Sequence, residues 1–102
     1  MKRVMVRYKV KPDRVAENEE LCRAVYDELK SKAPPGIRYM TFKLEDGVSF
    51  IHVASIETDD GSNPLSGIDA FKAFQKDIGA RCDEPPAATE LAAEVGSYGF
   101  FD

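Results

Sequence analysis

The chain has 102 residues, of which 43% are hydrophobic and 31% charged, as in an ordinary globular domain with a single core. Its formal net charge of -4 argues against nucleic acid or an anionic membrane as the main partner, because both attract a basic surface. The chain starts with alternating charged and apolar residues, and no apolar run approaches the roughly 18 residues of a membrane helix. We therefore predict no signal peptide and no membrane span, and expect one cytoplasmic domain over residues 1–102.

A strand and a helix are predicted at the start of the chain. Residues 3–11 alternate in polarity, which is typical of a strand with one buried face. Its apolar side carries Val4, Val6, Tyr8 and Val10, and its other side carries Met5, Arg7 and Lys9. Pro12 ends the strand, and Asp13 is a fair N-cap for a helix that runs to about Lys32, where residues 33–36 (APPG) stop it. The inward side of this helix is predicted to carry Val15, Leu21, Cys22, Val25, Tyr26 and Leu29.

Residues 37–44 and 48–56 are rich in β-branched and aromatic side chains and predict the two strands of a hairpin. Asp46-Gly47 between them is a strong turn signal, because glycine accepts a positive φ. A two-residue loop pairs Thr41 with His52 and Tyr39 with Ala54. A three-residue loop that includes Glu45 remains the alternative, and it would move one strand's side chains to the opposite face. We prefer the two-residue register, since it separates apolar from mixed residues better.

This register predicts two faces of different character. One face carries Met40, Phe42, Leu44, Ile51 and Val53 and is expected to form the core. The other carries Ile37, Tyr39, Thr41, Lys43, Phe50, His52, Ala54 and Ile56, a mixture expected of a pocket wall.

A polar loop over residues 58–64 leads to a second predicted helix, which begins near Leu65 or Ile68 and continues to Arg81. Its apolar stripe consists of Phe71, Phe74 and Ile78. Residues 83–86 (DEPP) are expected to end it. A last strand is predicted within residues 89–101, where Gly96 and Gly99 indicate a bulge or bend.

The element order is therefore β-α-β-β-α-β, which predicts a ferredoxin-like α+β fold: a four-stranded antiparallel sheet with both helices on one face. The uncovered face would expose Met5, Tyr39, Phe50, His52, Ala54 and Ile56. Since a monomer rarely leaves so much apolar sheet in water, we expect two sheets to face each other in a homodimer that encloses a cavity.

Cys22 and Cys82 are far apart in the chain and form no CxxC motif, so we expect two reduced thiols on helices, with a disulfide or redox pair as the alternative. The sequence contains a single histidine, and its cysteines and histidine have no spacing typical of a zinc site. Neither a metal nor another cofactor is predicted.

His52 is the natural candidate for acid–base catalysis, because histidine alone has an unperturbed pKa near neutrality; a hydrogen-bonded structural histidine is the alternative. Arg7 could bind a carboxylate or phenolate, or form a salt bridge across the dimer. Tyr39 and Tyr98 could orient a substrate oxygen or simply pack as buried tyrosines do. Two further candidates for substrate contact are Thr41 and Phe50, on the predicted pocket face.

Three stretches resemble one known family: VMVRYKVKP in the first strand, FIHVASIETDD before the second helix, and AFKAFQKDIG within it. They are similar to the dimeric α/β-barrel superfamily, and specifically to the antibiotic biosynthesis monooxygenase-like domains. The resemblance spans nearly the whole chain. It implies a homodimer with a barrel pocket for a small organic molecule, and oxygenation or isomerisation without a cofactor.

Three functions therefore remain open. The first is an enzyme in which Arg7 and Tyr39 hold a polar group and His52 moves a proton. The second is a non-catalytic dimer that binds a small ligand or is purely structural. The third is an RNA-binding sheet, which the acidic charge argues against.

Overall fold

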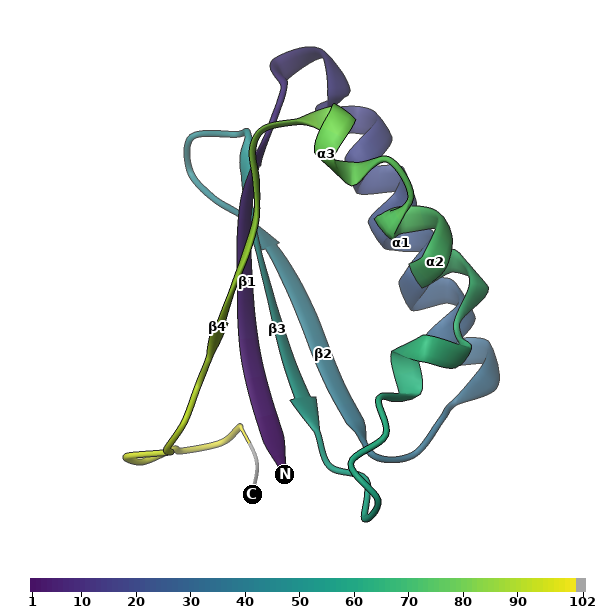
Figure 1. The fold of residues 1–102 in the computed structure, drawn as a ribbon, viewed down its shortest axis with the longest axis vertical. Helices are drawn as coiled ribbons and strands as arrows, with labels where there is room; N and C mark the ends of the chain where they lie inside the picture. The colour runs from purple at the N-terminus through teal and green to yellow at the C-terminus, as the bar shows by residue number, and fades with distance from the viewer. Residues whose placement is uncertain (101–102) are drawn as a thin grey trace.

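A computed structural model describes residues 1–100 and shows a sheet with its helices packed on one face (Figure 1). The strands are β1 (Lys2–Val10), β2 (Ile37–Lys43), β3 (Ser49–Ile56) and β4 (Cys82–Glu90), and the helices are α1 (Val15–Lys32), α2 (Asp69–Gln75) and α3 (Ile78–Arg81), with short 3-10 turns at Pro12–Arg14 and Pro64–Gly67. The strand order is β2-β3-β1-β4, and every neighbouring pair is antiparallel. The ferredoxin-like α+β prediction is confirmed. No helix among the described residues is long and apolar enough to cross a membrane.

The hairpin register follows the prediction, although its loop is longer. Thr41 pairs with His52 and Tyr39 with Ala54, as the two-residue loop requires. The strand pairing ends at Lys43 and Phe50, two pairs earlier than the two-residue loop requires, so that residues 44–48 form the turn and Gly47 has a φ of 76°. The Asp46 carboxylate closes this turn by accepting hydrogen bonds from the backbone N–H groups of Val48 and Ser49. These bonds and the one from the Ser49 hydroxyl lower the pKa of Asp46 to about 2.

The assignment of the two sheet faces was wrong, and the structure reverses it. Tyr8, Phe50, His52, Ala54 and Ile56 are buried beneath the helices, whereas Phe42 is 55% exposed on the other side. Both faces of β2 and β3 carry apolar side chains, so alternation alone could not show which face the helices would cover. The uncovered face, called the open face below, carries Met5, Arg7, Met40, Phe42, Ile51, Val53 and Ala87, which pair with one another across the strands.

Helix α1 ends as predicted but begins differently. Ala33 adopts a left-handed conformation (φ 45°) at the end of the helix, and its N–H bonds to Leu29 O before the two prolines. The N-cap position is occupied by Arg14, without a side-chain cap, because a 3-10 turn separates Asp13 from the helix. The expected cap at Asp13 was therefore wrong.

The second predicted helix is two helices. Backbone at Lys76 becomes extended and Asp77 is left-handed (φ 58°), which separates α2 from α3. The start of α2 is capped from outside: the Glu28 carboxylate of α1 accepts hydrogen bonds from the N–H groups of Asp69 and Ala70. The Lys32 ammonium is the main reason that the pKa of Glu28 falls to about 2, and these two backbone bonds add to its effect. This contact ties the two helices together over the sheet.

The last strand lies earlier than predicted. Strand β4 covers Cys82–Glu90, so the DEPP segment lies inside a strand and does not merely end a helix. Prolines are tolerated there because β4 is an edge strand, paired only with β1. Residues 91–100, including Gly96 and Gly99, follow the strand, and the predicted end at residue 101 lies outside the described residues. Cys82 consequently begins a strand, while Cys22 lies on α1 as expected; both are free thiols.

Candidate functional site

A cavity of about 440 Å³ lies between the sheet and the second helical segment. Its walls come from β1, β2, β3, β4, the polar loop and α2–α3, and they are mostly apolar. The polar side chains among the lining residues are Tyr8, Tyr39, His52, Asn63 and Gln75, and no Asp, Glu, Lys or Arg of the described part of the chain lines it. A volume of this size and a wall of this kind are typical of sites for small organic ligands. Pro86 and Ala88 bring the exposed edge strand β4 to its rim.

His52 forms part of the cavity wall, and both of its ring nitrogens have partners. The Tyr8 hydroxyl lies 2.7 Å from Nε2. The Tyr39 hydroxyl lies 2.5 Å from Nδ1, and Thr41 Oγ1 lies 3.1 Å from the same atom. The Tyr26 hydroxyl in turn lies 2.6 Å from Thr41 Oγ1. Strands β1, β2 and β3 thus present one polar cluster beneath α1.

The cluster continues from Tyr8 toward α3. The Asn18 amide donates to the Tyr8 hydroxyl at 2.9 Å, and its oxygen accepts from Nε and Nη2 of Arg81, both at 3.4 Å. Arg81 is only 2% exposed and also donates to the carbonyl oxygens of Phe74 (2.7 Å) and Lys76 (3.1 Å). The Glu17 carboxylate lies 3.9 Å from Arg81 Nε at the surface. This buried cation is therefore surrounded by acceptors.

Burial keeps His52 and the three tyrosines of the cluster neutral. It lowers the pKa of His52 to about 4 and raises the pKa of Tyr26 to about 12, since both charged forms would lose water. It also raises the pKa of Tyr8 and of Tyr39 well above the usual value for tyrosine. At neutral pH the cavity wall therefore offers hydrogen-bond donors and acceptors without a net charge.

Four of the six predicted site residues come together, and two do not. Tyr39, Thr41, Phe50 and His52 lie on the helix-covered face, with the Phe50 ring stacked on Tyr8 at 5.5 Å between centroids. Arg7 pairs with Ile51 on the open face and is exposed, so it cannot reach the cavity. Tyr98 is 93% exposed in the segment after β4. The structure therefore does not bring Arg7 and Tyr98 to the His52 site, because each prediction depended on the misassigned face or strand.

The sequence analysis missed Asn18 and Arg81 as site residues. Asn18 lies four residues before Cys22 on the buried stripe of α1, and Arg81 lies three residues after Ile78 on the stripe of the second helix. Both are almost completely buried, with Asn18 at 0% exposed. A polar side chain at an apolar helix position was the signal that could have indicated them.

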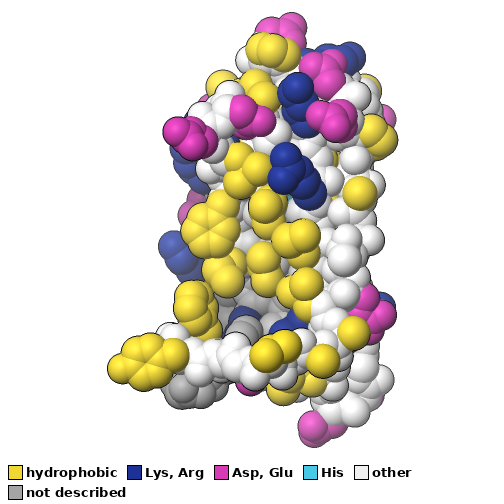
Figure 2. All heavy atoms as spheres, turned by 90° about the vertical axis from the view of Figure 1, so that its left-hand side faces the viewer, with side chains coloured by type: hydrophobic (Ala, Val, Ile, Leu, Met, Phe, Trp, Pro, Cys, Tyr) yellow, Lys and Arg dark blue, Asp and Glu magenta, His cyan; other side chains and the backbone are white. Residues whose placement is uncertain are grey.

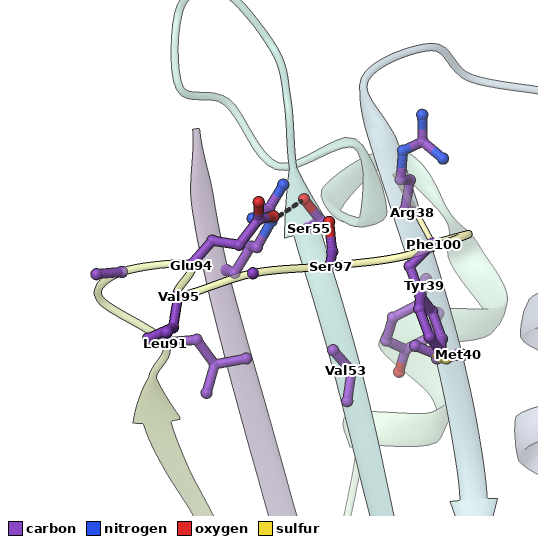
Figure 3. Close-up of a pocket in the computed structure, with 13 residues that line it drawn as sticks. Arg38, Tyr39, Met40, Val53, Ser55, Leu91, Glu94, Val95, Ser97 and Phe100 are labelled. Atoms are coloured by element: carbon purple, nitrogen blue, oxygen red, sulfur yellow. Dashed lines mark hydrogen bonds and ion pairs between the residues drawn. The ribbon is translucent and has the colours of Figure 1, made fainter. Parts of the chain in front are cut away.

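A second hollow lies on the open face. It measures about 560 Å³ and is lined by strand residues and by the segment after β4, which crosses the sheet there (Figure 3). Arg3 donates to Ser55 Oγ at 3.1 Å and pairs with Glu94 at 2.9 Å, which holds this segment to β1. Its wall contains no His or Cys, and half of it consists of exposed residues of that segment. We therefore regard the His52 cavity as the candidate site.

Within residues 1–100, no three His, Cys, Asp or Glu side chains come together as metal ligands. The His52 partners are hydroxyl groups, which are not the usual ligands of zinc.

Comparison with solved structures gives close agreement in fold. An antibiotic biosynthesis monooxygenase is 16% identical, with 92% of this chain and 99% of that chain covered and a TM-score of 0.72. Rv0793 from Mycobacterium tuberculosis is 20% identical (95% and 98% covered, TM-score 0.71). A protein of Caulobacter crescentus CB15, provisionally assigned as an antibiotic biosynthesis monooxygenase, is 24% identical (91% and 89% covered, TM-score 0.70). No sequence-family model and no curated protein matches the chain. At these identities the likeness shows the fold alone.

Proposed function

Because this chain has the fold of the antibiotic biosynthesis monooxygenase-like proteins, we propose that it is a monooxygenase-like enzyme that binds a small organic molecule in the His52 cavity. We assign this role to one domain, residues 1–102, acting in the cytoplasm without a cofactor. One observation carries the proposal: an apolar cavity of about 440 Å³ has a neutral His–Tyr cluster in its wall.

The cluster supports chemistry on a carbonyl compound. Tyr39 holds the substrate oxygen, and the neutral imidazole of His52 takes up and returns a proton through the Tyr8 hydroxyl, which lines the cavity and lies 2.7 Å from Nε2. Removal of a proton beside a carbonyl yields an electron-rich carbon that can react with O₂. Conversion of a CH₂ group to C=O then consumes one O₂ and releases one H₂O, with all four electrons supplied by the substrate.

We expect the protein to consume O₂ in the presence of 2-tetralone, a small ketone with an acidic CH₂ group. The variant His52→Gln should reduce the rate of O₂ uptake by roughly 100-fold or more.

Ala88→Phe should abolish binding of the ketone, because the new ring fills the cavity from β4. Its control is Ala87→Phe, since Ala87 pairs with Arg7 on the opposite face of the same strand. An oxygen electrode measures uptake, and titration calorimetry measures binding.

The outcomes of this experiment separate the candidate functions. Binding without O₂ uptake would replace the enzyme with the alternative, a non-catalytic ligand-binding dimer. No binding, or equal binding by the Ala88→Phe and Ala87→Phe variants, would contradict a ligand site in the cavity and leave a structural dimer.

We further propose that two copies associate through the open face. Figure 2 shows apolar side chains gathered over the middle of this face, with charged side chains of both signs toward its upper end. Met5, Phe42, Ile51 and Val53 lie on neighbouring strands there, and Phe42 is more than half exposed. A second copy supplies the same apolar patch, as a two-fold interface requires. In contrast to the sequence prediction, this interface does not enclose the His52 cavity.

Phe42→Glu is expected to convert the dimer into a monomer, because the interface would then bury two carboxylates without partners. Sedimentation equilibrium gives the mass directly. Ala24→Glu, an exposed change on α1, is the matched control and should remain dimeric. A wild-type protein that sediments as a monomer at all concentrations would contradict the dimer.

A further inference from the structure

One chain of hydrogen bonds joins α3 to the cavity wall, and each of its five residues comes from a different element. It runs from Arg81 (α3) through Asn18 (α1), Tyr8 (β1) and His52 (β3) to Tyr39 (β2). Each link measures between 2.5 and 3.4 Å between donor and acceptor atoms. The chemistry of Arg81, the first residue, determines which group donates and which accepts in every later hydrogen bond of the chain.

Arg81 can only donate, because a guanidinium has five N–H groups and no acceptor. The Asn18 atom that faces it must therefore be the amide oxygen, which leaves the amide NH₂ to donate to the Tyr8 hydroxyl. Tyr8 is 2% exposed, and its own hydroxyl hydrogen needs an acceptor. Among the described residues the strong acceptor within reach is Nε2 of His52, at 2.7 Å, since the Cys22 sulfur beside the hydroxyl is only a weak acceptor.

The tautomer of His52 follows from this direction. Since Nε2 accepts from Tyr8, the single proton of the neutral imidazole lies on Nδ1. Nδ1–H then donates to the Tyr39 oxygen, with Thr41 Oγ1 as a second acceptor. The Tyr39 hydroxyl hydrogen then points away from His52, with Thr41 Oγ1 within reach as an acceptor, and it can turn to a ligand because Tyr39 lines the cavity.

We propose that Asn18 and Arg81 are positioning residues that hold His52 in the Nδ1–H tautomer and so make Tyr39 the hydrogen-bond donor of the cavity. This inference rests on the proposed function, and it also names the class of ligand that the cavity binds. Among residues 1–100 no Asp, Glu, Lys or Arg side chain lines the cavity, so the matching molecule is neutral and apolar and carries an acceptor such as a ketone oxygen.

The tautomer can be measured without any ligand, because His52 is the only histidine. Long-range ¹H–¹⁵N NMR of the full chain at pH 7 distinguishes a protonated from an unprotonated ring nitrogen. We expect Nδ1 to be protonated and Nε2 unprotonated in the wild type. A wild-type spectrum of the Nε2–H form would overturn the proposal, whatever the variants do.

Asn18→Asp should invert the tautomer. A carboxylate only accepts, so it would take hydrogen bonds from both Arg81 and the Tyr8 hydroxyl. Tyr8 would then present its lone pair to His52 and favour Nε2–H. Val25→Ala is the matched control, since Val25 is a buried residue of α1 whose side chain carries no hydrogen-bonding group; it should keep Nδ1–H. An unchanged tautomer in a folded Asn18→Asp protein would contradict the positioning role.

Arg81 offers a second route if Asn18→Asp does not fold. Lysine also only donates, so Arg81→Lys should keep Nδ1–H. Arg81→Gln can accept as well as donate, which frees the Asn18 amide to turn and should populate Nε2–H. Identical spectra from these two variants would overturn the role of Arg81.

A pair of ligands tests the consequence for binding. The wild type should bind 2-tetralone roughly 2- to 12-fold more tightly than the hydrocarbon tetralin, the ratio expected for one neutral hydrogen bond. Tyr39→Phe and Asn18→Asp should both remove this preference. Equal affinities in the wild type would overturn the donor role of Tyr39. Binding of neither compound would contradict the proposed function and leave the NMR result to decide the tautomer.

Discussion

Replacing Arg81 with alanine is expected to lower the free energy of unfolding by about 3–5 kcal/mol, because several buried acceptors would each lose a donor at about 1–3 kcal/mol. Arg81 is 2% exposed and donates to two backbone carbonyl groups and to the Asn18 amide oxygen. Its guanidinium also lies 5.3 Å from the centre of the Phe74 ring. Alanine would leave these acceptors buried without donors and open a cavity beside the ring.

Urea unfolding measures this loss. Arg23→Ala is the matched control, because Arg23 is an exposed arginine on α1 that pairs with Glu19 at 3.3 Å, and an exposed pair is worth at most about 1 kcal/mol. A loss below about 1 kcal/mol for Arg81→Ala would show that water replaces the guanidinium at no great cost, and would weaken its structural role.

The protein is expected to lose stability as the pH falls from 7 toward 4, because the unfolded chain binds a proton at His52 that the folded chain resists. The pKa of His52 is about 4 in the fold and 6.5 as an unperturbed group, and burial is the cause. Between these values the unfolded state binds more protons, so the free energy of unfolding rises with pH. The contribution is fully present above about pH 6.5 and is lost through pH 4, in total about 3 kcal/mol and about 1 kcal/mol of it between pH 7 and 5.5.

Among the described residues packed around the ring, His52 itself is the group whose protonation changes between pH 7 and 4. The ionisable side chains around it are Tyr8, Tyr39, Tyr26 and Cys22, and burial raises the pKa of each one above its usual value, so they stay neutral here. Capping carboxylates such as Glu28 have a pKa of about 2 and change stability mainly below about pH 4.5. Urea unfolding at pH 5.5 and 7 should therefore show a slope in the wild type and almost none in His52→Gln. A slope that persists in the variant would assign it to another group.

Much of the fold could be predicted from local pattern. Alternating residues predicted β1, the APPG segment predicted the end of α1, and Asp46-Gly47 predicted the register that places Thr41 opposite His52. Each of these signals acts within a few residues, so the sequence carries it without knowledge of the rest of the chain. The position of β4 was not predictable in this way, because its two prolines resemble a loop and only pairing with β1 makes them part of a strand.

The site depended on the tertiary structure. The sequence by itself determined the element order, the hairpin register and the single histidine with Tyr39 and Thr41 beside it. It could not determine which face of the hairpin the helices cover, because both faces are apolar enough to be buried. Nor could it bring Asn18 to Arg81 across 63 positions of sequence. Packing of α1 and α3 against one face decided both, and it buried His52 under the helices as a neutral member of a hydrogen-bond chain, whereas the sequence analysis placed it on the face between two copies.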